Sequence, residues 1–140
     1  MPHYRDSSHI YRVSELDQLP WLVHGFGTRL ADIPALFANL ATLKQIHSSE
    51  CVPAEGRTGQ LGEGDALLEN TPGGVVAIKT ADCIPVLLAD ERLHAVAAVH
   101  AGWRGTAARI AAAFYYLEAA RYLLNRPWCW QLSHLANVGP

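Results

Sequence analysis

The pattern of apolar and polar positions is most informative between residues 75 and 105. Two apolar runs, at 84–89 and 94–99, flank the polar residues 90–93, which indicates two antiparallel strands joined by a tight turn. If the turn is centred between Glu91 and Arg92, Cys83 lies directly opposite His100. Directly opposed residues have Cβ atoms roughly 4.5–5.5 Å apart. The predicted β-hairpin therefore brings a thiol and an imidazole together at its open end.

Shorter apolar segments predict further strands at 21–26 and 75–79, and an apolar segment begins at 65. A turn is expected at 71–74, and the stretch 55–64, rich in Gly and Glu, is predicted to be an exposed loop. Residues 32–43 predict a helix with Asp32 near its N-cap and Pro34 in its first turn. That helix is expected to bury Leu36, Phe37 and Leu40.

The region after the hairpin predicts the longest helix of the chain, over 107–124, from its alanine content and the spacing of its larger apolar residues. A glycine-flanked loop carrying Arg104 precedes it, and Thr106 is the expected helix cap. A guanidinium beside free backbone N–H groups can bind an anion, so we expect phosphate there. The alternative is a plain turn with its arginine in solvent.

Composition narrows the class of protein. The 140 residues are of single-domain size and half are hydrophobic, so we expect one domain over 1–140, as a monomer or homodimer. A net charge of -2 predicts no nucleic-acid or membrane-surface partner. The three cysteines, an odd number, indicate a reducing compartment rather than a disulfide framework. With no apolar leader or long apolar run, we expect a soluble, cytoplasmic protein.

The candidate chemistry centres on Cys83 and His100. With either His47 or His24 they can form a three-ligand zinc site that leaves one position open. A metal-free alternative has Cys83 as nucleophile and His100 as base, with Asp82 or Asp65 orienting the imidazole. Cys51 and Cys129 have apolar neighbours and receive no role.

Six short motifs, in this order, resemble the laccase-domain (YfiH-like) family. This group has been described as multicopper polyphenol oxidases and as purine nucleoside phosphorylases with adenosine deaminase activity. The motifs are HGFGTR (24–29), KQIH (44–47), GDALL (64–68), TADCIPVLL (80–88), VHAGWRG (99–105) and VGP (138–140).

The resemblance implies an α/β (α+β) fold, an α/β/β/α layered sandwich with a mixed sheet like that of CNF toxins. It implies zinc, or alternatively copper, held by His47, Cys83 and His100. It also implies catalytic roles for Cys83, His100 and Asp82. The substrate contacts it suggests are Arg29, Asp82 and Arg104, to which the sequence adds Thr106 at the expected helix start.

The function implied is zinc-dependent phosphorolysis of purine nucleosides, with adenosine deamination at the same site; nucleoside and phosphate would be the partners. The alternatives are a copper-dependent polyphenol oxidase, a peptidoglycan-editing Cys/His hydrolase and an inactive binding module. Two departures stand out. Family members continue past VGP, so we expect a chain truncated relative to the family, and residues 30–33 replace a glycine-rich piece.

Overall fold

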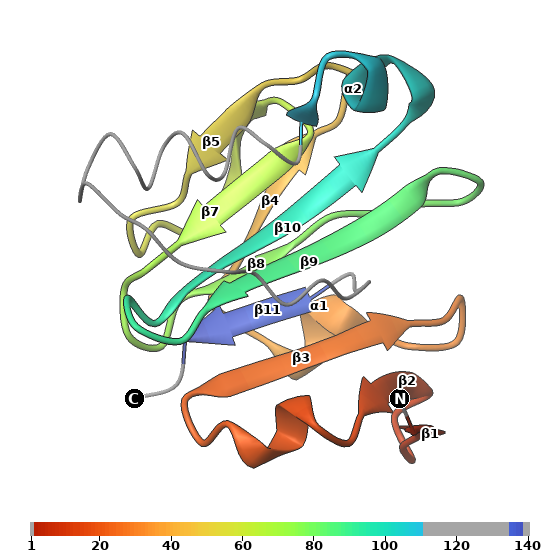
Figure 1. Ribbon diagram of the computed structural model, residues 1–140, viewed down its shortest axis with the longest axis vertical. Helices are drawn as coiled ribbons and strands as arrows, with labels where there is room; N and C mark the ends of the chain where they lie inside the picture. Colours follow the sequence, from red (N-terminus) through yellow and green to blue (C-terminus); the bar gives the residue numbers. More distant parts are fainter. Residues whose placement is uncertain (1, 111–134, 139–140) are drawn as a thin grey trace.

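The structure, a computed structural model, describes residues 2–110 and 135–138. Within these residues the strands form two sheets, one of seven strands in the order β1-β2-β3-β11-β8-β4-β6 and one of four in the order β5-β7-β10-β9 (Figure 1). The larger sheet comprises β1 (His3–Arg5), β2 (Ile10–Val13), β3 (Leu22–Gly27), β4 (Leu40–Lys44), β6 (Gly59–Glu63), β8 (Val75–Ala77) and β11 (Leu135–Val138). The smaller comprises β5 (Cys51–Pro53), β7 (Ala66–Glu69), β9 (Ile84–Asp90) and β10 (Ala95–Ala101).

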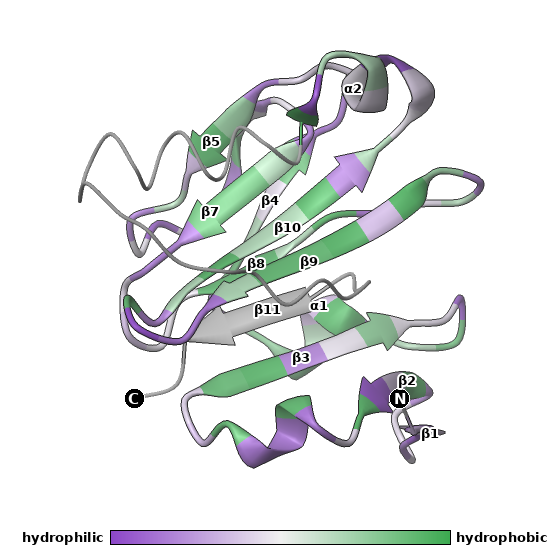
Figure 2. Cartoon of the chain, in the orientation of Figure 1, coloured by the Kyte–Doolittle hydropathy of each residue, from purple (hydrophilic) through white to green (hydrophobic). Residues whose placement is uncertain are grey.

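Successive side chains along the central strands point to opposite faces of a sheet and pack into two different apolar clusters. In β10, Val96 and Ala98 belong to the cluster shared by both sheets, whereas Ala97 and Val99 belong to a cluster that contains Ile110. In β8, Val76 joins the shared cluster. Such strands, buried on both faces, are mostly hydrophobic, as Figure 2 shows for β7 and β10, whose hydrophilic positions lie near their ends.

Helical segments lie against the outer faces of the two sheets. Ile33 of α1 (Ile33–Leu36) packs on Val75 and Ala77 of β8. Ile110, after α2 (Trp103–Ala107), packs on the outer face of the smaller sheet. The α/β/β/α order is therefore confirmed. The sheets are mixed, because β4 pairs in parallel with β6 and β8 and β5 with β7, while the remaining pairs are antiparallel.

The hairpin of β9 and β10 is confirmed, but its predicted register is wrong. His100 pairs with Pro85 and Ala101 with Ile84, so Cys83 lies just before β9 instead of opposite His100. The turn is shifted by one residue because the Asp90 carboxylate accepts the N–H groups of Arg92 and Leu93, a turn-forming arrangement typical of Asp.

Cys83 nevertheless stays near His100. The correct register adds two to the sum of paired residue numbers, and a shift of two preserves the face on which each side chain lies. Cys83 is thus two positions from the direct partner of His100, and its sulfur lies within 4.8 Å of a ring nitrogen of His100.

The predicted helix over 32–43 is mostly wrong. Asp32 does cap α1, accepting from the N–H of Ala35 at 3.2 Å, but the helix ends at Leu36. Residues 40–44 form β4 instead, because Ala41 and Leu43 point into the core between the sheets. Leu36 is 46% exposed and not buried. Burial in the sheet interior outweighs helix propensity here.

Two further predictions need correction. The exposed stretch 55–64 is not all loop, since it contains β6, which pairs in parallel with β4. The helix expected near Thr106 begins earlier, at Trp103, with Gly102 as N-cap. Thr106 caps nothing; its N–H donates to the Gly102 carbonyl at 2.8 Å, inside α2. The predicted helical residues 111–124 and the tail 125–134 lie outside the described residues.

The remaining helical turn is the 3-10 segment η1 (Leu16–Gln18). Of the helices in the described part of the chain, none is long and apolar enough to cross a membrane.

Candidate metal centre

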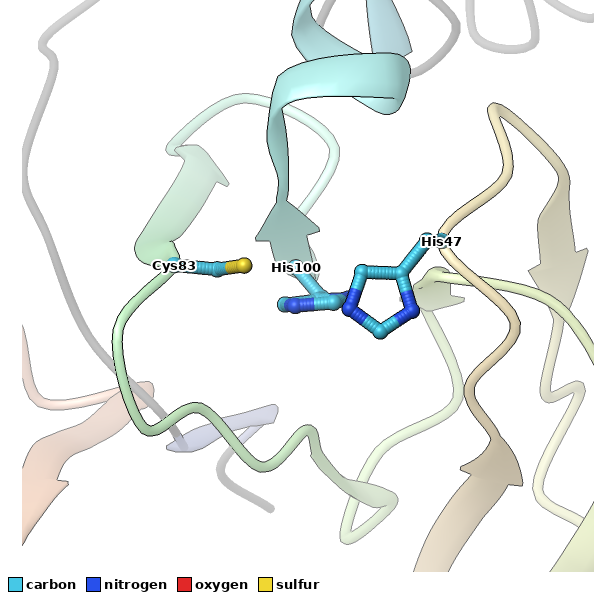
Figure 3. A group of neighbouring side chains, drawn as sticks. All are labelled: His47, Cys83 and His100. Carbon is cyan, nitrogen blue, oxygen red and sulfur yellow. The ribbon is translucent and has the colours of Figure 1, made fainter.

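Three side chains from separate segments converge at one end of the β9–β10 hairpin (Figure 3). They are His47 from the loop after β4, Cys83 from the segment between β8 and β9, and His100 near the end of β10. One ligand atom from each, the Cys83 sulfur and a ring nitrogen of each histidine, lies within 4.8 Å of the other two. Thiolate and imidazole are ligands that zinc and copper accept. The group can therefore hold a metal ion.

Asp65 orients the innermost ligand. His100 is 4% exposed, Asp65 is fully buried, and the His100 Nδ1 lies 2.7 Å from the Asp65 Oδ1. A carboxylate only accepts hydrogen bonds, so the Nδ1 carries the proton and Nε2 is left to bind the ion. The His100 N–H also donates to the Asp65 carbonyl at 2.7 Å. Carboxylate–histidine pairs of this kind fix ring orientation in metal sites.

The same carboxylate organises the loop that carries the outer ligand. Asp65 accepts the backbone N–H of His47 at 3.0 Å and both the N–H and the hydroxyl of Ser48, at 2.6 and 2.7 Å. Burial alone raises the pKa of Asp65, but the hydrogen bonds from His100, Ser48 and Ile46 outweigh it and lower the pKa. One ionised side chain thus couples two of the three ligands.

His47 adopts an uncommon backbone conformation, with φ of 57°. This left-handed region costs a non-glycine residue free energy and persists where surrounding contacts enforce it, here the hydrogen bonds to Asp65. The exposed His47 ring meets the buried His100 ring at an interplanar angle of 76°, with centroids 4.9 Å apart. His47 forms the solvent side of the site.

Gly102 lies next to all three ligands. A Cβ placed on it would lie 3.3 Å from the His47 Cδ2, 3.4 Å from the Cys83 Sγ and 3.8 Å from the His100 Cε1. Its φ of -71° is open to any residue, so the absence of a side chain serves space and not backbone freedom. The glycine leaves room for the ligands to converge.

The structure separates the two histidines that sequence spacing left as alternatives. His24 is buried in β3, where its Nε2 accepts the Val13 N–H at 2.8 Å, and it is absent from the ligand group. The choice of acid is also resolved, because Asp65 and not Asp82 contacts His100. The sequence left Asp82 and Asp65 as alternatives for this role, in the metal-free interpretation.

The other predicted site residues are solvent-facing. Arg29 follows β3, Asp82 precedes Cys83, and Arg104 and Thr106 lie in α2; all four are exposed. The Arg104 guanidinium lies 5.3 Å from the centroid of the Trp103 ring, a cation–π contact. None of the four belongs to the ligand group, and their roles stay predictions.

Cys51 is chemically unlike a metal ligand. Burial, with a smaller contribution from Glu50, raises the pKa of its thiol to about 12. A thiol must ionise to bind a metal or attack an electrophile, so the absence of a predicted role for Cys51 is consistent with its surroundings. Cys129 lies outside the described residues.

Comparison with known proteins identifies relatives. Residues 23–127 match the family model described as multi-copper polyphenol oxidoreductase laccase. A purine nucleoside phosphorylase of Deinococcus radiodurans is 47% identical over 72 residues, 51% of this chain and 28% of that protein. Adenosine deaminase RL5, from an unknown prokaryotic organism, is 51% identical over 49 residues, 35% of this chain and 19% of that protein. The matched segments thus span less than a third of either relative.

The fold also has a solved counterpart. The crystal structure of a Bacillus licheniformis protein titled hypothetical protein YfiH superposes with a TM-score of 0.74 at 21% identity, covering 89% of this chain and 61% of that one. At this identity the likeness concerns the fold alone.

Proposed function

Because the chain belongs to the multi-copper polyphenol oxidoreductase laccase family, we propose that it carries the zinc site of a purine nucleoside phosphorylase that also deaminates adenosine. Relatives named for these two activities support an enzyme acting on nucleosides. The observation that carries the proposal is the convergence of His47, Cys83 and His100, with ligand atoms within 4.8 Å. Three protein ligands leave a coordination position open, as in catalytic zinc sites.

The proposed role of each ligand follows from its burial and its hydrogen-bond partners. His100, buried and anchored by Asp65, binds through Nε2, and the Asp65 carboxylate stabilises positive charge on the ring. Cys83 binds as the thiolate, and His47 closes the solvent side. When bound, the ion supplies Lewis-acid activation of a substrate oxygen or of water. The ligands themselves hold the reacting group at the open end of the hairpin.

Phosphate recognition is assigned to Arg104. Its guanidinium is exposed and lies four residues after His100, beside the Trp103 ring. A guanidinium offers a planar pair of donors matched to phosphate oxygens. Arg29 is the second candidate for this contact. In phosphorolysis, phosphate attacks C1′ of the ribose as the C1′–N9 bond breaks, and the purine leaves with the bond electrons and takes up a proton.

Asp82 and Thr106 are assigned to substrate contact. Asp65 already orients His100, so Asp82, which is exposed and adjacent to Cys83, is suited to accept a hydrogen bond or proton from the nucleoside. Thr106 offers a hydroxyl on the exposed surface of α2.

Copper-dependent phenol oxidation, suggested by the family description, is a weaker candidate. Within the described part of the chain one His/Cys group has ligand geometry, and multi-electron oxygen reduction by a multicopper enzyme uses several copper centres. A mixed His/His/Cys group also suits zinc.

Elemental analysis of the purified chain together with a base-release assay tests the proposal. We expect about one zinc per chain and release of purine base from inosine or adenosine that depends on phosphate. Phosphate-independent release would indicate hydrolysis, and oxygen-dependent oxidation of a phenol by the copper-loaded chain would favour the laccase alternative. Absence of metal, of base release with or without phosphate, and of phenol oxidation would leave a binding module.

A further inference from the structure

Gln45 joins the segment of one proposed metal ligand to the segment of another. Its side-chain Nε2 donates to the Lys79 carbonyl at 2.6 Å, and its Oε1 accepts the Lys79 N–H at 2.7 Å. Gln45 lies two residues before His47, and Lys79 lies four residues before Cys83. The two hydrogen bonds therefore close a short bridge between the loops that present His47 and Cys83.

The Gln45–Lys79 bridge lies beyond the end of the pairing between β4 and β8. β4 and β8 pair in parallel through Leu40 with Val75 and Ala41 with Val76. Beyond them the backbones diverge, because the chain after β8 crosses to the other sheet and re-enters as β9. A primary amide can donate and accept at once, like a peptide unit, so the Gln45 side chain bonds to the Lys79 backbone beyond the point where strand pairing stops.

The crossing segment needs such support. Residues 78–83 form neither helix nor strand, yet Cys83 must stay within reach of two histidines held by other elements. Asp65 bonds to the His47 and Ser48 backbone and to the His100 ring. Gln45 supplies a direct connection from that assembly to the segment carrying Cys83.

We propose that Gln45 is a positioning residue that holds the segment 79–83 so that the Cys83 sulfur stays beside His47 and His100. The inference rests on the metal site in the proposed function. It assigns Gln45 no contact with substrate or metal. Its effect is to pre-form the site, which lowers the entropy lost when the ion binds.

The same strand pair provides a matched control at its opposite end. The Asn39 Nδ2 donates to the Gly73 carbonyl at 2.6 Å, again joining residues 34 apart in sequence just outside β4 and β8. Both amides tether exposed backbone, but only Gln45 lies beside the ligands. A general effect of removing an amide tether would be common to both variants.

Titration of the metal-depleted chain with Co²⁺ tests the proposal, with thiolate-to-cobalt charge-transfer absorption reporting the Cys83–metal bond. We expect Gln45→Ala to weaken Co²⁺ binding about tenfold, the lower end for residues that orient ligands, and to reduce the charge-transfer intensity per bound ion. Asn39→Ala should retain both values. Gln45→Leu keeps a side chain of similar size but can neither donate to nor accept from Lys79, so it should resemble Gln45→Ala and replaces it if Gln45→Ala does not fold.

Hydrogen exchange separates this proposal from the proposed function. In metal-free protein, the Lys79 amide should exchange faster in Gln45→Ala than in the unaltered chain or in Asn39→Ala. If the unaltered chain binds no Co²⁺ through a thiolate, the proposed metal function fails, while unchanged exchange at Lys79 would overturn the role of Gln45. Equal Co²⁺ affinity and equal charge-transfer intensity in Gln45→Ala and the unaltered chain would also overturn it.

Discussion

The buried Asp65 carboxylate lies 2.7 Å from the Nδ1 of His100 while it also accepts the backbone N–H of His47. One acidic group thereby sets the orientation of a ring and the position of a loop. We expect Asp65→Asn to lower metal affinity by about 10- to 100-fold, as for other groups that orient metal-binding histidines. It should also lower stability, because a neutral amide replaces the carboxylate as a buried acceptor.

Zinc titration of the folded variant measures the effect. Asp6→Asn is the control, since Asp6 also accepts backbone N–H groups and pairs with Arg12, but in the turn between β1 and β2. Zinc affinity unchanged in Asp65→Asn would refute the orienting role.

Replacing Cys83 by serine should remove most of the metal, because a serine hydroxyl stays protonated near neutral pH and is a poor ligand. Cys51→Ser should leave the metal content unchanged, since the Cys51 thiol, with its pKa raised to about 12 by burial, stays protonated. Metal analysis of both variants after dialysis gives the comparison. Full occupancy in Cys83→Ser would mean that the ligand set is wrong.

Gly102→Ala tests whether the ligands need the space that the missing Cβ of Gly102 leaves, and it does so without straining the backbone. The added methyl group would lie 3.3 Å from the His47 Cδ2, so the His47 ring must shift by a few tenths of an ångström, whereas its distances of 3.4 Å to the Cys83 Sγ and 3.8 Å to the His100 Cε1 are ordinary contacts. We expect weaker zinc binding, by about tenfold, with a small change in thermal stability. Gly73→Ala is a poor control because of its φ of 82°, whereas Ala101→Ser changes size next to the site without adding a Cβ there. Unchanged zinc affinity in Gly102→Ala would show that the ligands adapt.

Arg104→Lys should raise the phosphate concentration needed for half-maximal base release, because an ammonium group cannot make the paired hydrogen bonds of a guanidinium. Metal content should stay unchanged, since Arg104 is outside the ligand group. Base release measured against phosphate concentration decides the matter, with Arg29→Lys assayed in parallel. An effect in Arg29→Lys alone would transfer the phosphate contact to Arg29.

Stability should depend on pH through His24. Burial lowers the pKa of His24 below its ordinary value of 6.5, against a smaller raising effect of Asp17, while Arg12 lowers it further. Below pH 6.5 the unfolded chain therefore binds a proton that the folded chain does not. The free energy of unfolding should fall as pH falls through this window, by at most about 1.4 kcal/mol per pH unit from this group.

Protonation of the His24 Nε2 would in addition remove the acceptor of the Val13 N–H. His24→Gln keeps an acceptor but does not titrate. Urea unfolding of both proteins at pH 7.5 and 5.5, with a chelator present, isolates the contribution of His24. An equal loss of stability in both proteins would assign the pH dependence to other groups.

Short-range patterns in the chain were enough to predict the β9–β10 hairpin, the proximity of Cys83 and His100, and the Asp32 cap. Each depends on residues close in sequence or on a parity that survives an error of register. The motifs around them also predicted the layered fold, which the solved counterpart supports. The helix over 32–43 was wrong because local propensity does not register that Ala41 and Leu43 are needed in the core.

Tertiary structure alone decided how the ligands are held. Asp65 is 35 residues from His100, and Gln45 is 34 residues from Lys79, so neither contact leaves a periodic trace in the sequence. Both contacts join residues near the ends of strands that are neighbours in a sheet but distant in the sequence, β7 with β10 and β4 with β8. Spacing left His47 and His24 as alternatives and the motif resemblance favoured His47; the structure gives the physical reason, because β3 directs His24 towards the Val13 backbone, while the loop after β4 places the His47 ring beside His100. Residue types made a metal site chemically possible, and the packing of two sheets selected which residues form it.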